Sequence, residues 1–352
     1  MNETFMKEKP VLPLLVSMAL PNVISMLVNS LYNIVDSLFV ARISEDAMTA
    51  LSLVFPIQNF ANAIAIGFGI GINAMIALYL GAGDHKKAET AATHGMALSL
   101  MHGILITIVS IVIMPGFLRR FTSDADLIAS GITYSTIVFL FATINMAALA
   151  FEKMFQAVGR MKVTMAALIF GCVCNILLDP ILIFGFQLEV AGAAIATACS
   201  NTASVVFFAV QYARLKGHTA VSFRPKYFTF RFIGPIFSVG LASALATALG
   251  NASNMVMVHL ASGYGDIPVA AYGIVKRIDQ FPLNVSMGLC QGFMPLVGYN
   301  YAARNYDRMR SASYFSWKVA LIFSACCVTC FAAFAPQILH LFIPEAETSA
   351  LG

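Results

Sequence analysis

The sequence predicts an all-α polytopic membrane protein built from two related helical bundles. Three observations predict this fold class: a very apolar composition, apolar runs long enough to cross a bilayer, and an internal repeat. Of the 352 residues, 59% are AVILMFWYC and 11% are DEKR, against about 45–50% and about 25% in soluble domains. A mean hydropathy of +0.81 excludes a soluble domain and a disordered chain. The few basic residues form no dense patch, so nucleic acid is not an expected partner.

Nine apolar blocks are expected to span the membrane, because a spanning helix needs about 20 apolar residues. The blocks are 11–41, 50–80, 92–116, 128–157, 162–185, 191–213, 232–261, 268–300 and 312–336. The opening MNETFMKEKP lacks the apolar stretch and cleavage site of a signal peptide, so the first block is expected to remain as a span. The runs are continuous rather than alternating, which excludes a β-barrel. All seven cysteines lie inside these blocks, so neither a disulfide framework nor a zinc site is expected.

The basic residues predict how the spans are oriented. With a cytoplasmic N-terminus, fifteen of the 21 Lys and Arg residues fall in cytoplasmic segments and three within spans. The opposite side receives only Arg42, Arg119 and Arg120. Because Lys and Arg concentrate in cytoplasmic loops, we expect a multi-pass protein of the plasma (cytoplasmic) membrane with its N-terminus in the cytoplasm.

The chain repeats itself at an offset of 221 residues without a gap. One repeat holds six spans, an even number, so both copies cross the membrane in the same direction, as in two-lobed transporters. We therefore expect an N-lobe of six spans in residues 1–218 and a partial C-lobe of three spans in residues 219–352. Two full copies would contain twelve spans, so the sequence predicts a C-terminally truncated second lobe. The aligned pairs include Asn33 with Asn254, Gly67 with Gly288 and Gly71 with Gly292.

Two acids inside spans are the main candidates for a functional site. An ionisable group at the bilayer centre costs at least about 2.5 kcal/mol, so it is a functional candidate by default. Asp36 has Tyr32 one turn before it, and Asp179 has Asn175 one turn before it. Together Asp36, Asn175 and Asp179 could offer two carboxylates and an amide oxygen to Na⁺, or share a proton. The alternative is that each acid only bonds to a neighbouring helix.

Two further polar groups inside spans are weaker candidates. Glu152 lies two turns from the basic boundary of its span, and Lys153 beside it could extend its ammonium toward the interface, so a functional and a structural role for Glu152 both stay open. Lys276, Arg277 and Asp279 form a C-lobe polar cluster that an ion pair between residues three apart would explain without any substrate.

Several short motifs, in order and at repeat spacing, resemble those of the multidrug and toxic compound extrusion (MATE) family. The motifs are Pro21 and Asp36 in the first span, GAGDHKKAET (81–90), FQAVGRMK (155–162), NILLDP (175–180) and Thr197. Pro21 lacks an N–H and is expected to kink the first helix.

The resemblance implies a V-shaped pair of six-helix lobes that exports amphipathic, cationic compounds in exchange for Na⁺ or H⁺. It implies a cation site at Asp36, Asn175, Asp179 and Thr197, with Tyr32 and Glu152 lining the substrate cavity. It also implies a monomeric transporter with no cofactor beyond the coupling ion. The chain departs from the family in two ways. Some members have an acid on the seventh helix that forms a second cation site in the C-lobe, but residues 251–260 contain none. The last three helices of the family are also absent.

Three other functions fit parts of the sequence. A flippase for lipid-linked precursors would share the repeat, but its cavity would need cationic residues to meet a pyrophosphate, and only Lys153, Lys276 and Arg277 lie within spans. A transport-inactive fragment would also fit the length. An intramembrane aspartyl protease is suggested by Asp84 and Asp307, but both lie in basic loops outside a low-dielectric site. No catalytic triad or cofactor motif is present, so an enzyme is not expected.

Overall fold

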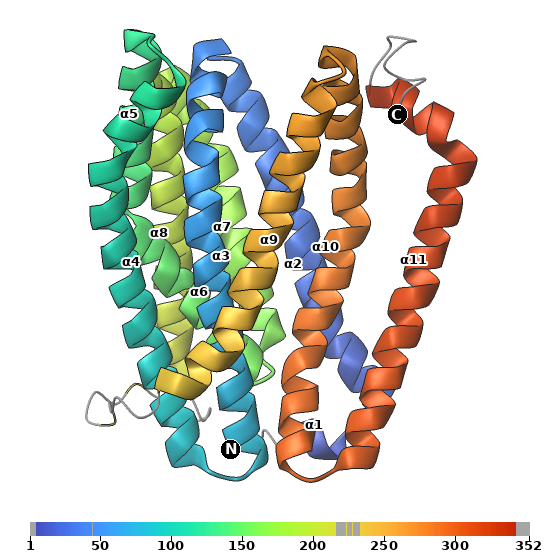
Figure 1. Ribbon diagram of the computed structural model, residues 1–352. Helices are drawn as coiled ribbons and strands as arrows, with labels where there is room; N and C mark the ends of the chain where they lie inside the picture. The colour runs from blue at the N-terminus through green and yellow to red at the C-terminus, as the bar shows by residue number, and fades with distance from the viewer. Residues whose placement is uncertain (1–4, 44, 216–222, 224–226, 228–232, 343–352) are drawn as a thin grey trace.

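The computed structural model describes residues 5–43, 45–215, 223, 227 and 233–342, which are helical apart from short turns. The long helices lie side by side, and their turns alternate between two ends of the molecule (Figure 1). The helices are α1 (Phe5–Glu8), α2 (Val11–Ala41), α3 (Glu45–Gly81), α4 (His85–Phe121), α5 (Ala125–Leu140), α6 (Ala142–Ala157), α7 (Met161–Pro180), the π-turn η1 (Ile181–Gly185), α8 (Glu189–Leu215), α9 (Ile233–Ser262), α10 (Asp266–Ala302) and α11 (Tyr306–Phe342).

Most of these helices are long and apolar enough to cross a membrane. Within the described residues seven helices meet this test, and α5 with α6, bent by 45° at a short break, makes an eighth span. They correspond to eight of the nine predicted blocks, which confirms the all-α polytopic fold class. The ninth block, 268–300, lies in α10, whose charged and polar residues make it less apolar, so composition alone does not identify it as a span.

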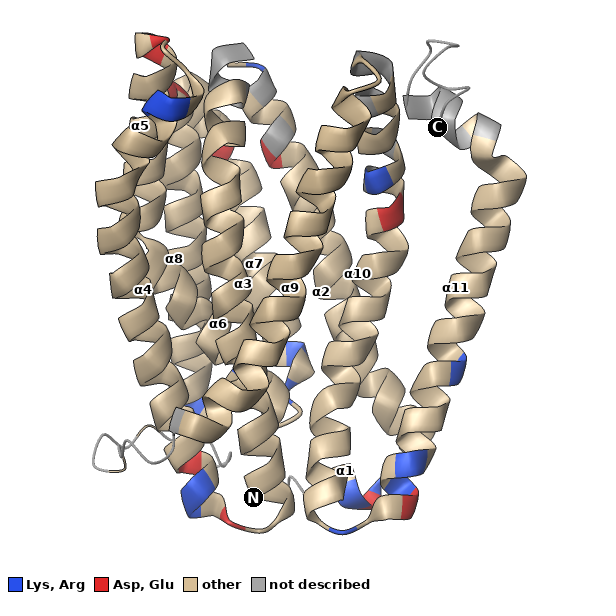
Figure 2. Cartoon of the chain, in the orientation of Figure 1, with Lys and Arg blue, Asp and Glu red and all other residues tan. Residues whose placement is uncertain are grey.

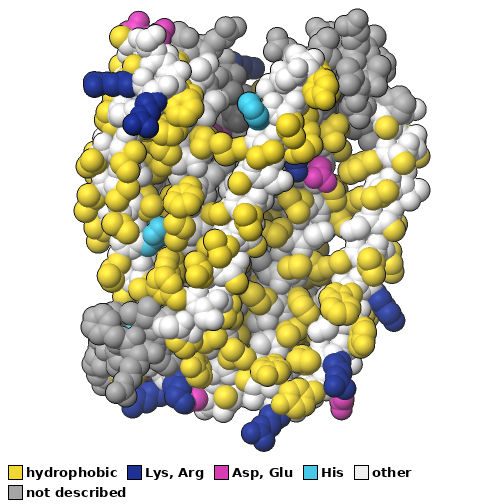
Figure 3. All heavy atoms as spheres, in the orientation of Figure 1, with side chains coloured by type: hydrophobic (Ala, Val, Ile, Leu, Met, Phe, Trp, Pro, Cys, Tyr) yellow, Lys and Arg dark blue, Asp and Glu magenta, His cyan; other side chains and the backbone are white. Residues whose placement is uncertain are grey.

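The surface agrees with a membrane environment. Hydrophobic side chains cover much of the visible flank, whereas Lys and Arg lie mostly near the two ends (Figure 3). One end carries α1 and the turns α3–α4 and α10–α11, and many of the described basic residues gather there (Figure 2). We call this end the basic end.

A capped turn begins α4 at the basic end. The Asp84 side chain accepts a hydrogen bond from the backbone N–H of Lys87 at 3.0 Å and pairs with its ammonium at 2.9 Å. These hydrogen bonds hold the pKa of the Asp84 carboxyl below its usual value. Gly83 supplies the positive φ of 75° that the turn requires. Capping therefore explains the GAGD part of the 81–90 motif, and Asp84 is engaged in helix structure.

Two glycine contacts join the first bundle, α2–α8, to the second bundle, α9–α11. A Cβ at Gly67 of α3 would lie 2.6 Å from Cβ of Ala244 in α9, and a Cβ at Gly288 of α10 would lie 2.7 Å from Cα of Val23 in α2. The offset of 221 relates Gly67 to Gly288 and Val23 to Ala244. Contacts between the bundles therefore occur at repeat-related positions, where only glycine permits the close approach.

Helix α1 touches both bundles at the basic end. The Met6 carbonyl accepts hydrogen bonds from Asn300 Nδ2 of α10 at 3.1 Å and from Arg308 Nε of α11 at 3.0 Å. Phe5 and Met6 also lie against Gly159, in the α6–α7 turn of the first bundle. Met6 is fully buried, so this short helix is part of the packed core.

Candidate functional site

Two carboxyl groups from different helices meet inside the first bundle. A side-chain hydrogen bond joins Asp36 of α2 to Asp179 of α7. Asp179 is fully buried, and its Oδ1 has no hydrogen-bond partner among the described residues. Ionised carboxylates only accept hydrogen bonds, so a bond between the two requires a proton on one of them. The pair is therefore able to hold a proton, or to replace it with a small cation.

The other predicted site residues surround this pair. With its amide nitrogen turned toward the carboxyl group, Asn175 donates to Asp179 Oδ2 at 2.7 Å, and its oxygen lies 3.2 Å from the backbone nitrogen of Thr197. This orientation is favoured because an amide oxygen facing a carboxylate would be repelled. The hydroxyl groups of Tyr32 and Thr197 form a side-chain hydrogen bond. The structure thus brings together Tyr32, Asp36, Asn175, Asp179 and Thr197, from α2, α7 and α8.

A local change of helix type follows the buried carboxyl group of Asp179. Pro180, which has no N–H, ends α7, and the chain continues as the π-turn Ile181–Gly185. The Phe186 N–H bonds to the Ile181 carbonyl at 2.9 Å, the five-residue spacing of a π-turn. Such turns are frequent at functional sites, and here the proline explains why regular α-helix stops directly beside Asp179.

Sequence reasoning missed two residues that extend the site. Tyr134 of α5 lies within electrostatic range of Asp36 and Asp179, and its hydroxyl forms a side-chain hydrogen bond with Gln58 of α3. The available signal was the polar tip of a tyrosine in an otherwise apolar span, since a buried tyrosine hydroxyl usually has a partner. Nothing in the sequence identified Gln58 as that partner.

Glu152 belongs to a second polar cluster rather than to the carboxyl pair. Lys153 Nζ bonds to Glu152 Oε1 at 2.8 Å, to Gln156 Oε1 at 3.1 Å and to Gln291 Oε1 of α10 at 3.2 Å. Gln156 also donates to Glu152 Oε1 at 2.8 Å. Lys153 does not reach the interface: its side chain is 4% exposed, packs over Gly69 and bonds to buried acceptors instead.

The remaining candidates lie apart from the pair. Lys276 Nζ and Asp279 Oδ2 are 3.7 Å apart, and both side chains are about half exposed, so the pair resembles a surface ion pair of small energetic value. The side chain of Arg277 lies outside the described part of the structure. Pro21 lies inside α2, which runs on as a single helix from Val11 to Ala41.

The donor set indicates which ions the site suits. Within the described residues, no group of three or more His, Cys, Asp or Glu side chains is placed to hold a metal ion. Two carboxyl groups with an amide and hydroxyl groups offer hard oxygen ligands and little charge, which suits a proton or Na⁺ better than a divalent transition metal.

Fold and site together define a polytopic α-helical membrane protein with ionisable side chains buried inside its spans. The chain belongs to the MatE family: the family profile matches residues 21–181 and 228–352. This confirms the family resemblance seen in the sequence motifs.

Relatives and solved structures agree with this assignment. The multidrug export protein MepA of Staphylococcus aureus (strain MSSA476) is 29% identical over 331 residues, covering 93% of this chain and 73% of MepA. MepA of Staphylococcus saprophyticus is also 29% identical over 331 residues. A structure described as the outward-facing conformation of a multidrug resistance MATE family transporter superposes with a TM-score of 0.92 at 25% identity, covering 100% of this chain and 79% of that chain. MATE in complex with MaL6 gives a TM-score of 0.93 at 25% identity, with 100% and 78% coverage.

Proposed function

We propose that this protein is a secondary transporter that exports amphipathic, cationic drugs or toxic compounds in exchange for Na⁺ or H⁺. The similarity to MepA, a multidrug export protein, supports the substrate class. In this proposal the chain acts as a monomer in the cytoplasmic membrane with its basic end in the cytoplasm, as the distribution of Lys and Arg favours. The protein needs no cofactor beyond the coupling ion and performs no covalent chemistry.

The observation that carries the coupling mechanism is the hydrogen-bonded pair Asp36 and Asp179. A proton or Na⁺ entering from outside neutralises the pair and changes how α2 packs on α7. Helix α2 also meets α10, where Val23 lies against Gly288. A shift of α2 is therefore transmitted to the second bundle, and ion binding alters the relative population of outward- and inward-facing states.

A lipid-linked precursor flippase remains the second candidate, but the structure favours it less. A pyrophosphate group would require cations free to meet it. Lys153 is buried and bonded to Glu152, and Lys276 is paired with Asp279. Ion-independent flipping of labelled lipid by the purified chain would reverse this ranking.

The test is drug efflux from cells that express the chain, with Asp36→Asn as the variant. The substitution keeps the side-chain shape but removes the ionisable group. We expect efflux to fall to background while the amount of protein in the membrane is unchanged. Asp279→Asn is the matched control, since Asp279 is exposed and lies outside the carboxyl pair, and it should retain efflux. Full efflux by Asp36→Asn would refute the coupling role.

Proteoliposomes separate the two coupling ions. An inward Na⁺ gradient at constant pH and an inward proton gradient without Na⁺ are imposed in turn on the purified protein. The gradient that drives substrate out identifies the ion. If neither gradient drives transport, the secondary-transport proposal is wrong.

A further inference from the structure

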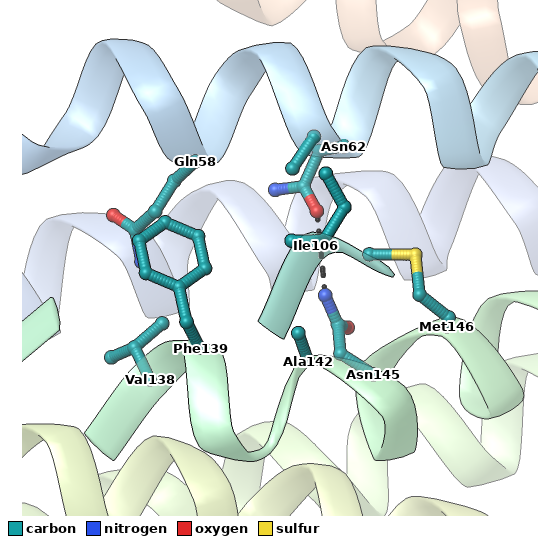
Figure 4. Close-up of a pocket in the computed structure, with 9 residues that line it drawn as sticks. Gln58, Asn62, Ile106, Val138, Phe139, Ala142, Asn145 and Met146 are labelled. Carbon is teal, nitrogen blue, oxygen red and sulfur yellow. Dashed lines mark hydrogen bonds between the residues drawn. The ribbon is translucent and has the colours of Figure 1, made fainter. Parts of the chain in front are cut away.

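A polar cavity lies at the break between α5 and α6, inside the first bundle. Its lining includes the amides of Gln58, Asn62 and Asn145 together with Phe139 and Met146 (Figure 4). Its volume, counted as the space that the centre of a water molecule can occupy, is about 40 Å³. One water needs about 10–15 Å³ on this measure, so the cavity has room for a small cluster of water molecules.

Three amide side chains give the cavity a lining that can bind water. Each primary amide offers two N–H donors and an oxygen with two lone pairs. Asn145 Nδ2 donates to Asn62 Oδ1 at 3.3 Å, and Gln58 bonds to the Tyr134 hydroxyl. These two bonds engage only some of the groups that the three amides offer, so the lining is polar enough to bind water.

The cavity adjoins the carboxyl pair through one tyrosine. Tyr134 is fixed on one side by Gln58, a cavity residue, and on the other lies within electrostatic range of Asp36 and Asp179. A change in the cavity therefore acts on the position of the Tyr134 hydroxyl, and the hydroxyl acts on the pair. This connection runs within the first bundle, away from the glycine contacts between bundles.

We infer that the cavity is a water-binding site that serves the carboxyl pair. Its water molecules hold Gln58, and through it Tyr134, in place beside Asp36 and Asp179. The binding of water rests on the cavity alone, whereas its part in coupling rests on the proposed role of Asp36 and Asp179.

Radiolytic hydroxyl labelling of the whole protein tests the water site, since radicals formed from bound water oxidise the side chains beside it. Met146 lines the cavity but is only 2% exposed, and Met18, 1% exposed in the apolar core, is the reference. We expect Met146 to be oxidised at least about fivefold faster than Met18. Equal rates would overturn the proposal.

Asn145→Leu, which keeps size and removes the amide, tests the link to coupling. It should lower the labelling of Met146 toward that of Met18 and reduce efflux severalfold. Asn251→Leu in α9, outside the cavity, is the control and should leave both unchanged. A fall in labelling with unaltered efflux would overturn the coupling role.

The labelling separates this proposal from the proposed function. Asp36→Asn should abolish efflux but leave Met146 labelling intact. If Asp36→Asn retains efflux while Met146 is labelled quickly, the water site stands and its coupling role falls with the proposed function. If efflux depends on Asp36 but Met146 is labelled no faster than Met18, the water site is wrong and the proposed function stands.

Discussion

Replacing Gly292 by alanine should weaken the closed contact between the bundles at the basic end. A Cβ at Gly292 of α10 would lie 2.5 Å from Cα and 2.8 Å from N of Ala19 in α2, and 2.8 Å from the Met18 carbonyl oxygen. Ordinary contact requires 3.4–4 Å, so the helices must separate by about 1 Å, an overpacking change that costs about 1–3 kcal/mol. All three atoms belong to the backbone, so no side chain can move aside.

The whole cost falls on the closed contact. Helix α10 is helical whether the bundles touch or separate, so the higher helix propensity of alanine does not change the balance between these two states. Since about 1.4 kcal/mol changes an equilibrium constant tenfold, a cost of about 1–3 kcal/mol should raise the ratio of separated to closed bundles by about 5- to 150-fold. Gly273→Ala, in the same helix with nothing within 4 Å, makes the same chemical change without a clash and is the matched control.

The assay is the distance distribution between spin labels at the basic end. Labels at His85 of α4 and Asp307 of α11, both exposed, report the separation of the bundles. We expect Gly292→Ala to enlarge the long-distance population and Gly273→Ala to leave it unchanged. Identical distributions for the two variants would show that the glycine contact does not hold the bundles together.

Three further substitutions test particular contacts. Lys153→Met leaves Glu152 buried without its cation and should destabilise the protein by about 3–5 kcal/mol. Adding Glu152→Gln should restore most of the lost stability, measured by thermal unfolding. A double variant no more stable than Lys153→Met alone would contradict the pairing. Arg304→Gly relieves a positive φ of 57° and should raise stability by about 1 kcal/mol, whereas a lower unfolding midpoint would refute the strain. Asp84→Ala removes the cap of α4 and should cost about 1 kcal/mol. Because folding lowers the pKa of Asp84, its stabilisation is present above the unfolded-state pKa of about 3.9 and is lost as pH falls through the lower folded-state value. The difference in unfolding free energy between wild type and Asp84→Ala should therefore vanish in acid. A difference that stays constant down to low pH would refute the role of the ionised cap.

Helical periodicity predicted much of the candidate site. The spacing of four residues placed Tyr32 with Asp36, and Asn175 with Asp179, on common faces. Which faces meet depends on packing between helices distant in sequence, so periodicity did not predict the contact between α2 and α7. The grouping of Asp36 with Asn175 and Asp179 was a hypothesis from their chemistry, and the family resemblance implied the same site. Tyr134 and Gln58 were missed for the same reason, since one polar residue in an apolar run does not identify its partner.

Lys153 illustrates a different limit of sequence reasoning, because the side chain is buried where the sequence suggested exposure. A lysine two turns from a basic boundary is expected to reach water, but the sequence does not reveal that Gln291, 138 positions later, lies close enough to accept its hydrogen bond. Residues that lower the hydropathy of α10 likewise have tertiary contacts that the sequence does not reveal. Gly288 and Gly292 pack against α2, and the polar Gln291 bonds to Lys153 in the buried cluster.

The position of α1 has a practical consequence for handling the protein. Hydrogen bonds from Asn300 and Arg308 hold the Met6 carbonyl to the second bundle, while Phe5 rests on the first. The bundles cannot part at this end unless α1 leaves one of them, by losing either these hydrogen bonds or its contact with Gly159. An affinity tag or fluorescent protein fused ahead of α1 would begin close to this attachment, so fusions that report on the conformational equilibrium should be compared with the untagged protein.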